Sequence, residues 1–258
     1  MSNIHPTAIV SPKAKLATDV EIGPYVVIED DVEIDEGTKI GHGTGIYNGA
    51  RIGKRVKIFQ NASISNFPQD LKFDGEITYL HIGDDSVIRE FTALHRATHA
   101  TEHTRIGKNC LLMAYTHVAH DCQLGDNIIL SNGVQLAGHI HIEDNVIIGG
   151  LSAIHQFCTI GKHCMIGGGS MVNTDVPPFV MTSGYPARYM GLNIIGLRRR
   201  NFSNTEIEAI KESYRLYYLA GLTPAAAKEI IAEKFPDEAY VKEILSFMEK
   251  STRGIIRK

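Results

Sequence analysis

The sequence predicts a mainly β protein, with a parallel β-helix over residues 1–190 and a C-terminal α-helical domain over residues 191–258. Two observations support this prediction. An aliphatic residue returns at every sixth position through most of the first part, and the repeat stops at Pro177-Pro178, after which helix signals begin. With 258 residues, 43% of them hydrophobic, the chain has enough apolar side chains for the cores of both parts.

The six-residue repeat defines the architecture of the first part. A period of six does not match the 3.6-residue period of an amphipathic helix, and it suits short strands separated by turns. Three hexapeptide repeats make one triangular coil, whose apolar side is buried against the neighbouring coils. The first run of the repeat is unbroken and consists of Ile4, Val10, Leu16, Ile22, Ile28, Ile34, Ile40, Ile46, Ile52, Ile58 and Ile64.

The repeat is interrupted twice, which predicts loop insertions near residues 66–81 and 99–105. It then continues without a gap from Ile106 to Val172. Insertions into such a regular solenoid usually have a functional reason.

All four cysteines occupy the fifth, small position of a repeat, which points into the coil. We therefore expect them to pack in the core as small hydrophobic side chains, and we predict no metal site and no disulfide. These residues are Cys110, Cys122, Cys158 and Cys164.

Three helices are expected after the repeat ends. Ser203 and Glu206 form a capping box for a helix that reaches about Ala220. Thr223-Pro224 opens a second helix, which ends near Phe235. A third helix is expected over 237–250, and together the helices close the open end of the solenoid.

Bulk properties limit the classes of function. The formal net charge of -3 gives no general signal for nucleic-acid binding. No apolar stretch approaches the roughly 20 residues of a membrane span, and the N-terminus lacks the pattern of a signal peptide. We expect a cytoplasmic protein without stable membrane insertion.

Stacking the coils predicts a polar site. Positions 18 residues apart lie above one another, roughly 4.8 Å apart. His120, Gly138 and Gln156 then form one column, and Asp121 and His139 belong to the next, together with Phe157. Several imidazoles along one edge would pack poorly in a hydrophobic core, so they indicate a catalytic or binding site.

The column offers the groups that acyl transfer to a hydroxyl requires. Histidine titrates near neutrality, so His120 can accept the proton of an alcohol as general base. The backbone N–H of Gly138 can donate to the oxyanion of the tetrahedral intermediate. Because no Ser or Cys nucleophile with its own base is evident, direct transfer is favoured over an acyl-enzyme.

Several segments, spread over nearly the whole chain, are specific enough to indicate a family. They are Gln69-Asp70-Leu71-Lys72, Ile88-Arg89-Glu90, His117-Val118-Ala119-His120-Asp121-Cys122, Leu136-Ala137-Gly138-His139, Ile148-Gly149-Gly150, His155-Gln156-Phe157-Cys158, Asp175-Val176-Pro177-Pro178 and Gly196-Leu197-Arg198-Arg199-Arg200. With these segments the sequence resembles the UDP-N-acetylglucosamine 3-O-acyltransferases of lipid A biosynthesis. The resemblance implies a left-handed β-helix, with His120 as general base, Gly138 as oxyanion donor and Asp121 as a plausible orienting neighbour.

The resemblance also implies the substrate contacts. Asp70 and Lys72 would contact the sugar and the acyl or phosphate groups from the inserted loop. Gly168 would set the acyl-chain length, because glycine leaves the tunnel open to longer 3-hydroxyacyl chains. The remaining side chains would line the cleft or, for the last three, hold the uridine and diphosphate: His117, His139, His155, Gln156, Asn193, Arg199 and Arg200.

The implied partners are a second and third copy of the chain, an acyl donor and an acyl acceptor. Enzymes of this family are homotrimers with the active site between subunits, so the inserted loop and the His120 edge are expected to come from different chains. The donor would be acyl carrier protein with its phosphopantetheine arm, and no other cofactor is expected. The acceptor would be UDP-N-acetylglucosamine.

Two residues depart from the family pattern and leave alternatives open. Ile195 replaces a glutamate that contacts the nucleotide sugar, and Pro186 replaces a histidine near the end of the acyl chain. A UDP-sugar with a 3-amino group is the first alternative, and another hexapeptide acyltransferase is the second. A zinc-dependent γ-type carbonic anhydrase and a noncatalytic scaffold are rivals from other classes.

Overall fold

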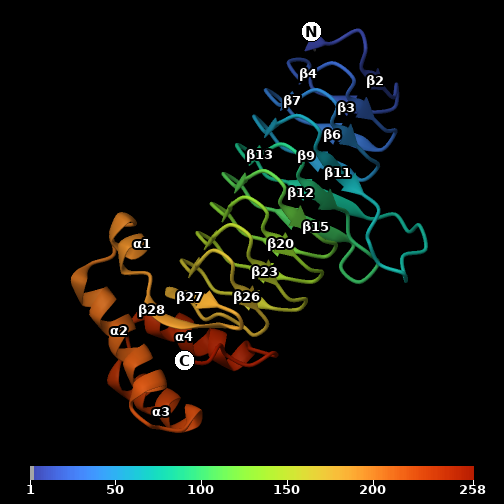
Figure 1. Cartoon of the computed structure of the whole chain (residues 1–258). Helices are drawn as coiled ribbons and strands as arrows, with labels where there is room; N and C mark the ends of the chain where they lie inside the picture. The colour runs from blue at the N-terminus through green and yellow to red at the C-terminus, as the bar shows by residue number, and fades with distance from the viewer. Residues whose placement is uncertain (1–2) are drawn as a thin grey trace.

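The computed structural model describes residues 3–258, and it shows a tapering solenoid of stacked coils with helices at its C-terminal end (Figure 1). Successive strands of one coil enter three different sheets in turn, and nearly all strand pairs are parallel. The prediction of a left-handed parallel β-helix with C-terminal helices is confirmed.

The strands are short, and each sheet takes every third one. The first sheet contains β1 Asn3–Ile4, β4 Glu21–Ile22, β7 Lys39–Ile40, β10 Lys57–Ile58, β13 Val87–Ile88, β16 Leu111–Leu112, β19 Ile129–Leu130, β22 Ile147–Ile148, β25 Met165–Ile166, β27 Val180–Gly184 and β28 Ala187–Leu192. The second sheet contains β2 Ile9–Val10, β5 Val27–Ile28, β8 Gly45–Ile46, β11 Ser63–Asn66, β14 Ala93–His95, β17 His117–Val118, β20 Gln135–Leu136, β23 Ala153–Ile154 and β26 Met171–Val172. The third sheet contains β3 Lys15–Leu16, β6 Val32–Ile34, β9 Ala50–Ile52, β12 Tyr79–Ile82, β15 His103–Ile106, β18 Gln123–Leu124, β21 His141–Ile142 and β24 Thr159–Ile160.

The repeated aliphatic residues form the core. Ile22 pairs with Ile40 and Ile40 with Ile58 in register, and all three are buried. Burial of such a side chain contributes about 1.5–3 kcal/mol, so each coil stabilises the next. All four cysteines are buried and free, as predicted, and burial raises the pKa of the Cys110 and Cys158 thiols to about 11.

The coils turn at three corners, which we name by the sheets they join. At each corner the chain takes a left-handed backbone conformation. At one of the corners, φ is 62° at Asp121 and, in the next two coils, 60° at His139 and 65° at Phe157. These three residues define the second–third corner, between β17, β20 and β23 on one side and β18, β21 and β24 on the other. Asn127 and Asn145 lie at the third–first corner.

Both inserted loops leave the solenoid at the second–third corner. The first, residues 67–78, joins β11 to β12, and the second, residues 96–102, joins β14 to β15. The second loop lies earlier than the predicted 99–105, because His103 and Thr104 extend β15 in register with Tyr79 and Leu80. Figure 1 shows the loops projecting together from one side of the solenoid.

The outer faces of the sheets differ in polarity. The third sheet presents polar residues such as Glu33, Arg51, His81 and Arg105, which are paired in register. The C-terminal half of the first sheet presents an apolar ladder, also in register, consisting of Val87, Leu111, Ile129, Ile147 and Met165.

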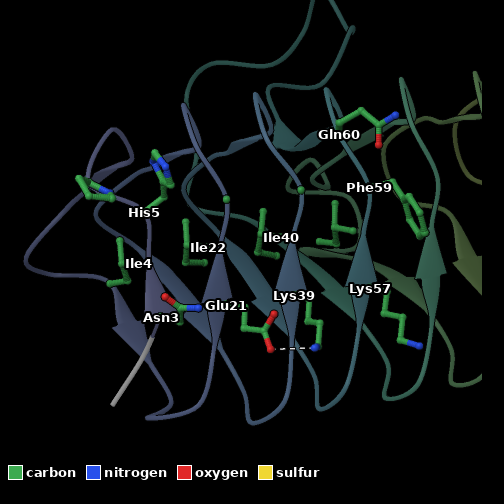
Figure 2. A pocket seen from close by; sticks show the side chains of 14 residues that line it. Asn3, Ile4, His5, Glu21, Ile22, Lys39, Ile40, Lys57, Phe59 and Gln60 are labelled. Atoms are coloured by element: carbon green, nitrogen blue, oxygen red, sulfur yellow. Dashed lines mark ion pairs between the residues drawn. The ribbon is translucent and has the colours of Figure 1, made fainter.

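The N-terminal half of the first sheet carries a groove of about 520 Å³ (Figure 2). Gly23 and Gly41 lie between His5 and Phe59 along its length, and an ion pair of 2.7 Å joins Glu21 to Lys39 beside it. None of the residues that line it was predicted as a site residue.

Four helices follow the last strand: α1 Ile194–Arg199, α2 Asn204–Leu219, α3 Pro224–Lys234 and α4 Ala239–Lys250. The capping box of Ser203 and Glu206 is present, and Thr223 caps α3 as its sequence indicates. The short helix α1 was not predicted, and α4 begins two residues later than expected. No helix within residues 3–258 is long and apolar enough to cross a membrane.

Candidate active site

His120 and Asp121 form a hydrogen-bonded pair at the second–third corner. His120 Nδ1 lies 2.7 Å from Asp121 Oδ2, and the His120 side chain retains 12% exposure while that of Asp121 retains none. A carboxylate only accepts, so Nδ1 carries the proton and Nε2 of the neutral ring keeps its lone pair. The corner conformation of Asp121 brings the two adjacent side chains together.

The second inserted loop holds the Asp121 carboxylate. Thr101 Oγ1 donates to Oδ1 at 2.5 Å, and Thr98 donates to Oδ2 through its hydroxyl at 2.8 Å. Burial by itself would raise the pKa of Asp121, but the hydrogen bonds from His120, Thr101 and Thr98 outweigh it and hold this pKa far below its usual range. Asp121 is therefore a fixed negative charge beside the imidazole.

Gly138 lies directly against the His120 ring, one coil further along. A Cβ at position 138 would meet His120 Cε1 at 2.8 Å and Nε2 at 2.9 Å, so only glycine leaves room for the imidazole. Among the residues the structure describes, the Gly138 N–H donates to no other group. The His120 ring and Gly138 are in register, as the spacing predicted.

His139 and His117 complete the wall around His120. His139 lies edge-on to His120, with ring centroids 5.1 Å apart, and stacks on Phe157 at 4.7 Å. Burial lowers the pKa of His139, and the carboxylates of Asp121 and Asp70 oppose that shift. Burial also lowers the pKa of His117 to about 4, so this ring is neutral.

The first inserted loop brings Asp70 and Lys72 towards the same corner. Asp70 Oδ1 accepts from the Lys72 amide at 3.0 Å, which closes a tight turn. The Asp70 carboxylate acts electrostatically on His139 and opposes the burial that lowers the pKa of that ring. The expectation that the inserted loop and the His120 edge come from different chains stays a prediction.

His155 and Gln156 lie one coil below Gly138 and are exposed. Beside them, a mainly apolar groove of about 480 Å³ runs along the second sheet. His155 lies in its wall with Ala153, Met171 and Asn173, and Tyr185-Pro186 close its lower end.

The predicted nucleotide ligands lie at a different corner. Arg200 donates from Nε to Asn145 Oδ1 at 3.2 Å, which places it at the third–first corner, and Arg199 precedes it on α1. Asn193 caps α1 by accepting from the Gly196 amide at 3.1 Å, so its side chain is already engaged. One chain does not bring these residues to His120.

Gly168 lies at the first–second corner, between β25 and β26. A Cβ there would meet only the backbone of the Gly149-Gly150 pair, with its nearest atom, the Gly150 oxygen, at 3.2 Å. Gly168 is exposed, so the rest of a larger side chain at this position would lie on the outside of the coil.

Comparison with known proteins gives the family. The family described as UDP N-acetylglucosamine O-acyltransferase, domain 2, matches residues 175–256, and the bacterial transferase hexapeptide family matches residues 103–138 and 139–174. A relative from Thiobacillus denitrificans, named acyl-[acyl-carrier-protein]--UDP-N-acetylglucosamine O-acyltransferase, is 47% identical over the whole of both chains. The chain belongs to this family. The acyltransferase is also 46% identical to a relative of the same name from Myxococcus xanthus, again over both whole chains.

Solved structures agree with this assignment. The acyltransferase superposes on LpxA from Acinetobacter baumannii with a TM-score of 0.95 and 46% identity, over 98% of this chain and 99% of that one. It superposes on the UDP-N-acetylglucosamine acyltransferase of Bacteroides fragilis with a TM-score of 0.97 and 42% identity, over 98% and 100%.

His120, Asp121 and His139 are close enough to hold a metal ion, with candidate ligand atoms within 4.8 Å of one another. The 2.7 Å separation of His120 and Asp121 is nevertheless that of a hydrogen bond, since two ligands of one tetrahedral zinc at about 2.1 Å each lie roughly 3.4 Å apart. The geometry of this pair is that of an imidazole hydrogen-bonded to a carboxylate.

Sequence reasoning missed His95, Thr98 and Thr101. His95 is buried, donates from Nδ1 to the Phe67 carbonyl at 2.5 Å, and faces His117 with ring centroids 5.0 Å apart. It thus joins the first loop to the histidine cluster. These residues adjoin or lie in the second loop, where the repeat no longer predicts which residues stack.

Proposed function

We propose that this acyltransferase moves a 3-hydroxyacyl chain from acyl carrier protein to the 3-hydroxyl of UDP-N-acetylglucosamine, the first step of lipid A biosynthesis. The observation that carries the proposal is the His120 ring, held by Asp121 and lying against the Gly138 amide. The names of the relatives do not favour a 3-amino sugar or another hexapeptide acyltransferase. We also propose a cytoplasmic location, where both the acyl carrier protein and the nucleotide sugar would be present.

The proton path follows from the fixed tautomer. Nε2 of His120 removes the proton of the sugar hydroxyl while its oxygen attacks the thioester carbonyl, and the imidazolium that forms is stabilised by Asp121. Collapse of the tetrahedral intermediate breaks the C–S bond. The same Nε2–H then protonates the departing thiolate, so that proton and electrons balance without a covalent enzyme intermediate.

The Gly138 amide stabilises the oxyanion of that intermediate. A backbone donor is fixed before reaction begins and has no side chain to shield it, which is the arrangement that lowers the barrier most. The phosphopantetheine arm belongs to the donor, and no further cofactor takes part.

A homotrimer would unite the two separated groups of residues. The apolar ladder on the outer face of the first sheet suits packing of one chain's first sheet on the next chain's second sheet. In a threefold assembly of triangular prisms, that contact sets the third–first corner of one chain beside the second–third corner of the next. Arg199 and Arg200 of one chain then face His120 of its neighbour.

The substrates can be arranged on this interface. Arg199 and Arg200 of the partner subunit take the diphosphate, for which the guanidinium fork is well shaped, and Asn193 positions the start of their helix. Asp70, Lys72 and the cleft side chains His117, His139, His155 and Gln156 surround the sugar. The acyl chain enters the apolar groove along Ala153 and Met171, towards the corner that carries Gly168.

Co-expression tests the assembly and the site together. His120→Ala and Arg200→Ala trimers should each be inactive with UDP-N-acetylglucosamine and 3-hydroxyacyl carrier protein, by mass spectrometry of the product. Mixed trimers should recover roughly a quarter of wild-type activity, because one site in four then combines both intact residues. Mixed trimers that stay inactive would show that His120 and Arg200 act from the same chain.

A further inference from the structure

The segment after α4 returns to the second–third corner and presents an arginine there. Asp175 is fully buried and clamps this segment: its Oδ2 accepts from Ser251 Oγ at 2.6 Å and from the Arg253 amide at 3.3 Å. The Asp175 amide donates to the Gly254 carbonyl at 2.9 Å. Figure 1 shows the segment turning back beneath the last coils.

Arg253 is thereby fixed at the foot of the catalytic column. Asp175 follows Asp121, His139 and Phe157 in the corner column, and Arg253 Nε donates to the Asn173 carbonyl at 3.2 Å. Asn173 also lines the groove that begins at His155. The guanidinium therefore lies about two coils, or roughly 10 Å along the axis, below Gly138.

The charge of Arg253 is not neutralised by the protein. Within residues 3–258 Arg253 forms no ion pair, and its side chain donates from Nε to the Asn173 carbonyl. The guanidinium also lies close enough to the Cys158 thiol to oppose the burial that raises that group's pKa, so it has no carboxylate but one thiol beside it. In the N-terminal coils, by contrast, Lys15, Lys39 and Lys54 are paired with Glu33, Glu21 and Glu36. A fixed, unpaired guanidinium at the end of a cleft suits an anion.

The proposed donor supplies such an anion at a suitable distance. Its prosthetic arm joins the thioester to a phosphodiester through two amide units, and it is about as long as a tetrapeptide, roughly 14 Å when extended. With the thioester carbonyl at Gly138 and the acyl chain in the groove, the arm can follow the corner past Gln156. Resting on the proposed function, we propose that Arg253 binds the phosphodiester of the donor's phosphopantetheine arm.

Three donors separate this role from a structural one: 3-hydroxyacyl carrier protein, 3-hydroxyacyl-phosphopantetheine and 3-hydroxyacyl-pantetheine, which lacks the phosphate. In the wild type, the phosphate should lower the donor KM by about tenfold, the effect of one charge-assisted contact. Arg253→Ala should raise the KM for the two phosphate-bearing donors by that factor and leave the KM for 3-hydroxyacyl-pantetheine, the KM for UDP-N-acetylglucosamine and kcat unchanged. Arg253→Lys should recover part of the loss.

Arg257→Ala is the matched control, because Arg257 is exposed on the same terminal segment and binds Tyr189 only through its backbone. It should leave all three donor KM values unchanged. An equal effect of Arg253→Ala on donors with and without phosphate, no effect at all, or the same effect from Arg257→Ala would overturn the assignment. A wild-type enzyme inactive with every donor would refute the proposed function and, with it, the role of Arg253.

Discussion

The second–third and third–first corners have the same backbone and opposite chemistry. At the third–first corner, Asn127 and Asn145 take up the left-handed conformation, which asparagine tolerates better than most residues. At the second–third corner the same conformation is taken by Asp121, His139 and Phe157, and His163 takes it at the third–first corner as well. The two corners therefore share one backbone and differ in the side chains that project from it. A regular repeat that accepts several residue types at its corners leaves these positions free to carry functional groups.

His120→Ala should have the largest effect, because it removes the ring that is hydrogen-bonded to Asp121 and lies against Gly138. We expect kcat to fall by about 10³ or more, with the fold retained since the ring is partly exposed. His141→Ala, on the outer face of the third sheet, is the control and should leave kcat unchanged. Product formation by mass spectrometry measures both, and substantial activity in His120→Ala would exclude its role as base.

Asp121→Asn should come next. An asparagine at this position can no longer stabilise the imidazolium or fix the Nδ1–H tautomer, so kcat should fall by about a hundredfold or more. The KM for UDP-N-acetylglucosamine should change little. A variant with normal kcat would mean that Asp121 serves only to anchor Thr98 and Thr101.

Gly138→Ala tests the glycine in register with the base. The added Cβ collides with the imidazole at 2.8 Å, so His120 must move away from the amide. We expect kcat to fall by roughly tenfold to a hundredfold, with an unchanged thermal transition by circular dichroism. Unaltered kinetics would show that the ring and the amide need not be in contact.

Acid should weaken the fold through half-buried neutral histidines. Burial lowers the pKa of His81, His117 and His163 to about 4, whereas the same residues in the unfolded chain titrate near 6.5. The unfolded state binds more protons between these values, so the free energy of unfolding falls as pH drops from about 6.5 to about 4. Urea titrations over this range should show the fall, with a shallower slope in His163→Phe. An equal slope in that variant would contradict the contribution of His163.

Asn127→Ala, at the third–first corner, should have the smallest effect of these variants. Alanine tolerates the left-handed corner less well, so the free energy of unfolding should drop by about 1 kcal/mol, as measured by urea denaturation. Activity should remain, because the hydrogen bond of Arg200 goes to Asn145, one coil further along, and not to Asn127. A drop in kcat without a loss of stability would be the opposite of this expectation.

The repeat explains why so much was predictable. One residue in six determines the core, so the periodicity alone gives the coils, the burial of the cysteines and the stacking of His120 on Gly138. The predictions were less complete where the period fails: His95, Thr98 and Thr101 act from or beside an insertion, and α1 is a single short helix with no apolar period. The separation of Arg200 from His120 depends on which corner α1 reaches, which the spacing does not encode.

The clamp formed by Asp175 has a consequence for how the protein is made. The last coil is closed by Ser251, Arg253 and Gly254, which lie far along the chain from Asp175. During synthesis the earlier coils can stack as they emerge, but this end stays open until the segment after α4 has been made. Removal of residues 251–258 should therefore leave the last coil open to solvent even though the repeat itself is intact.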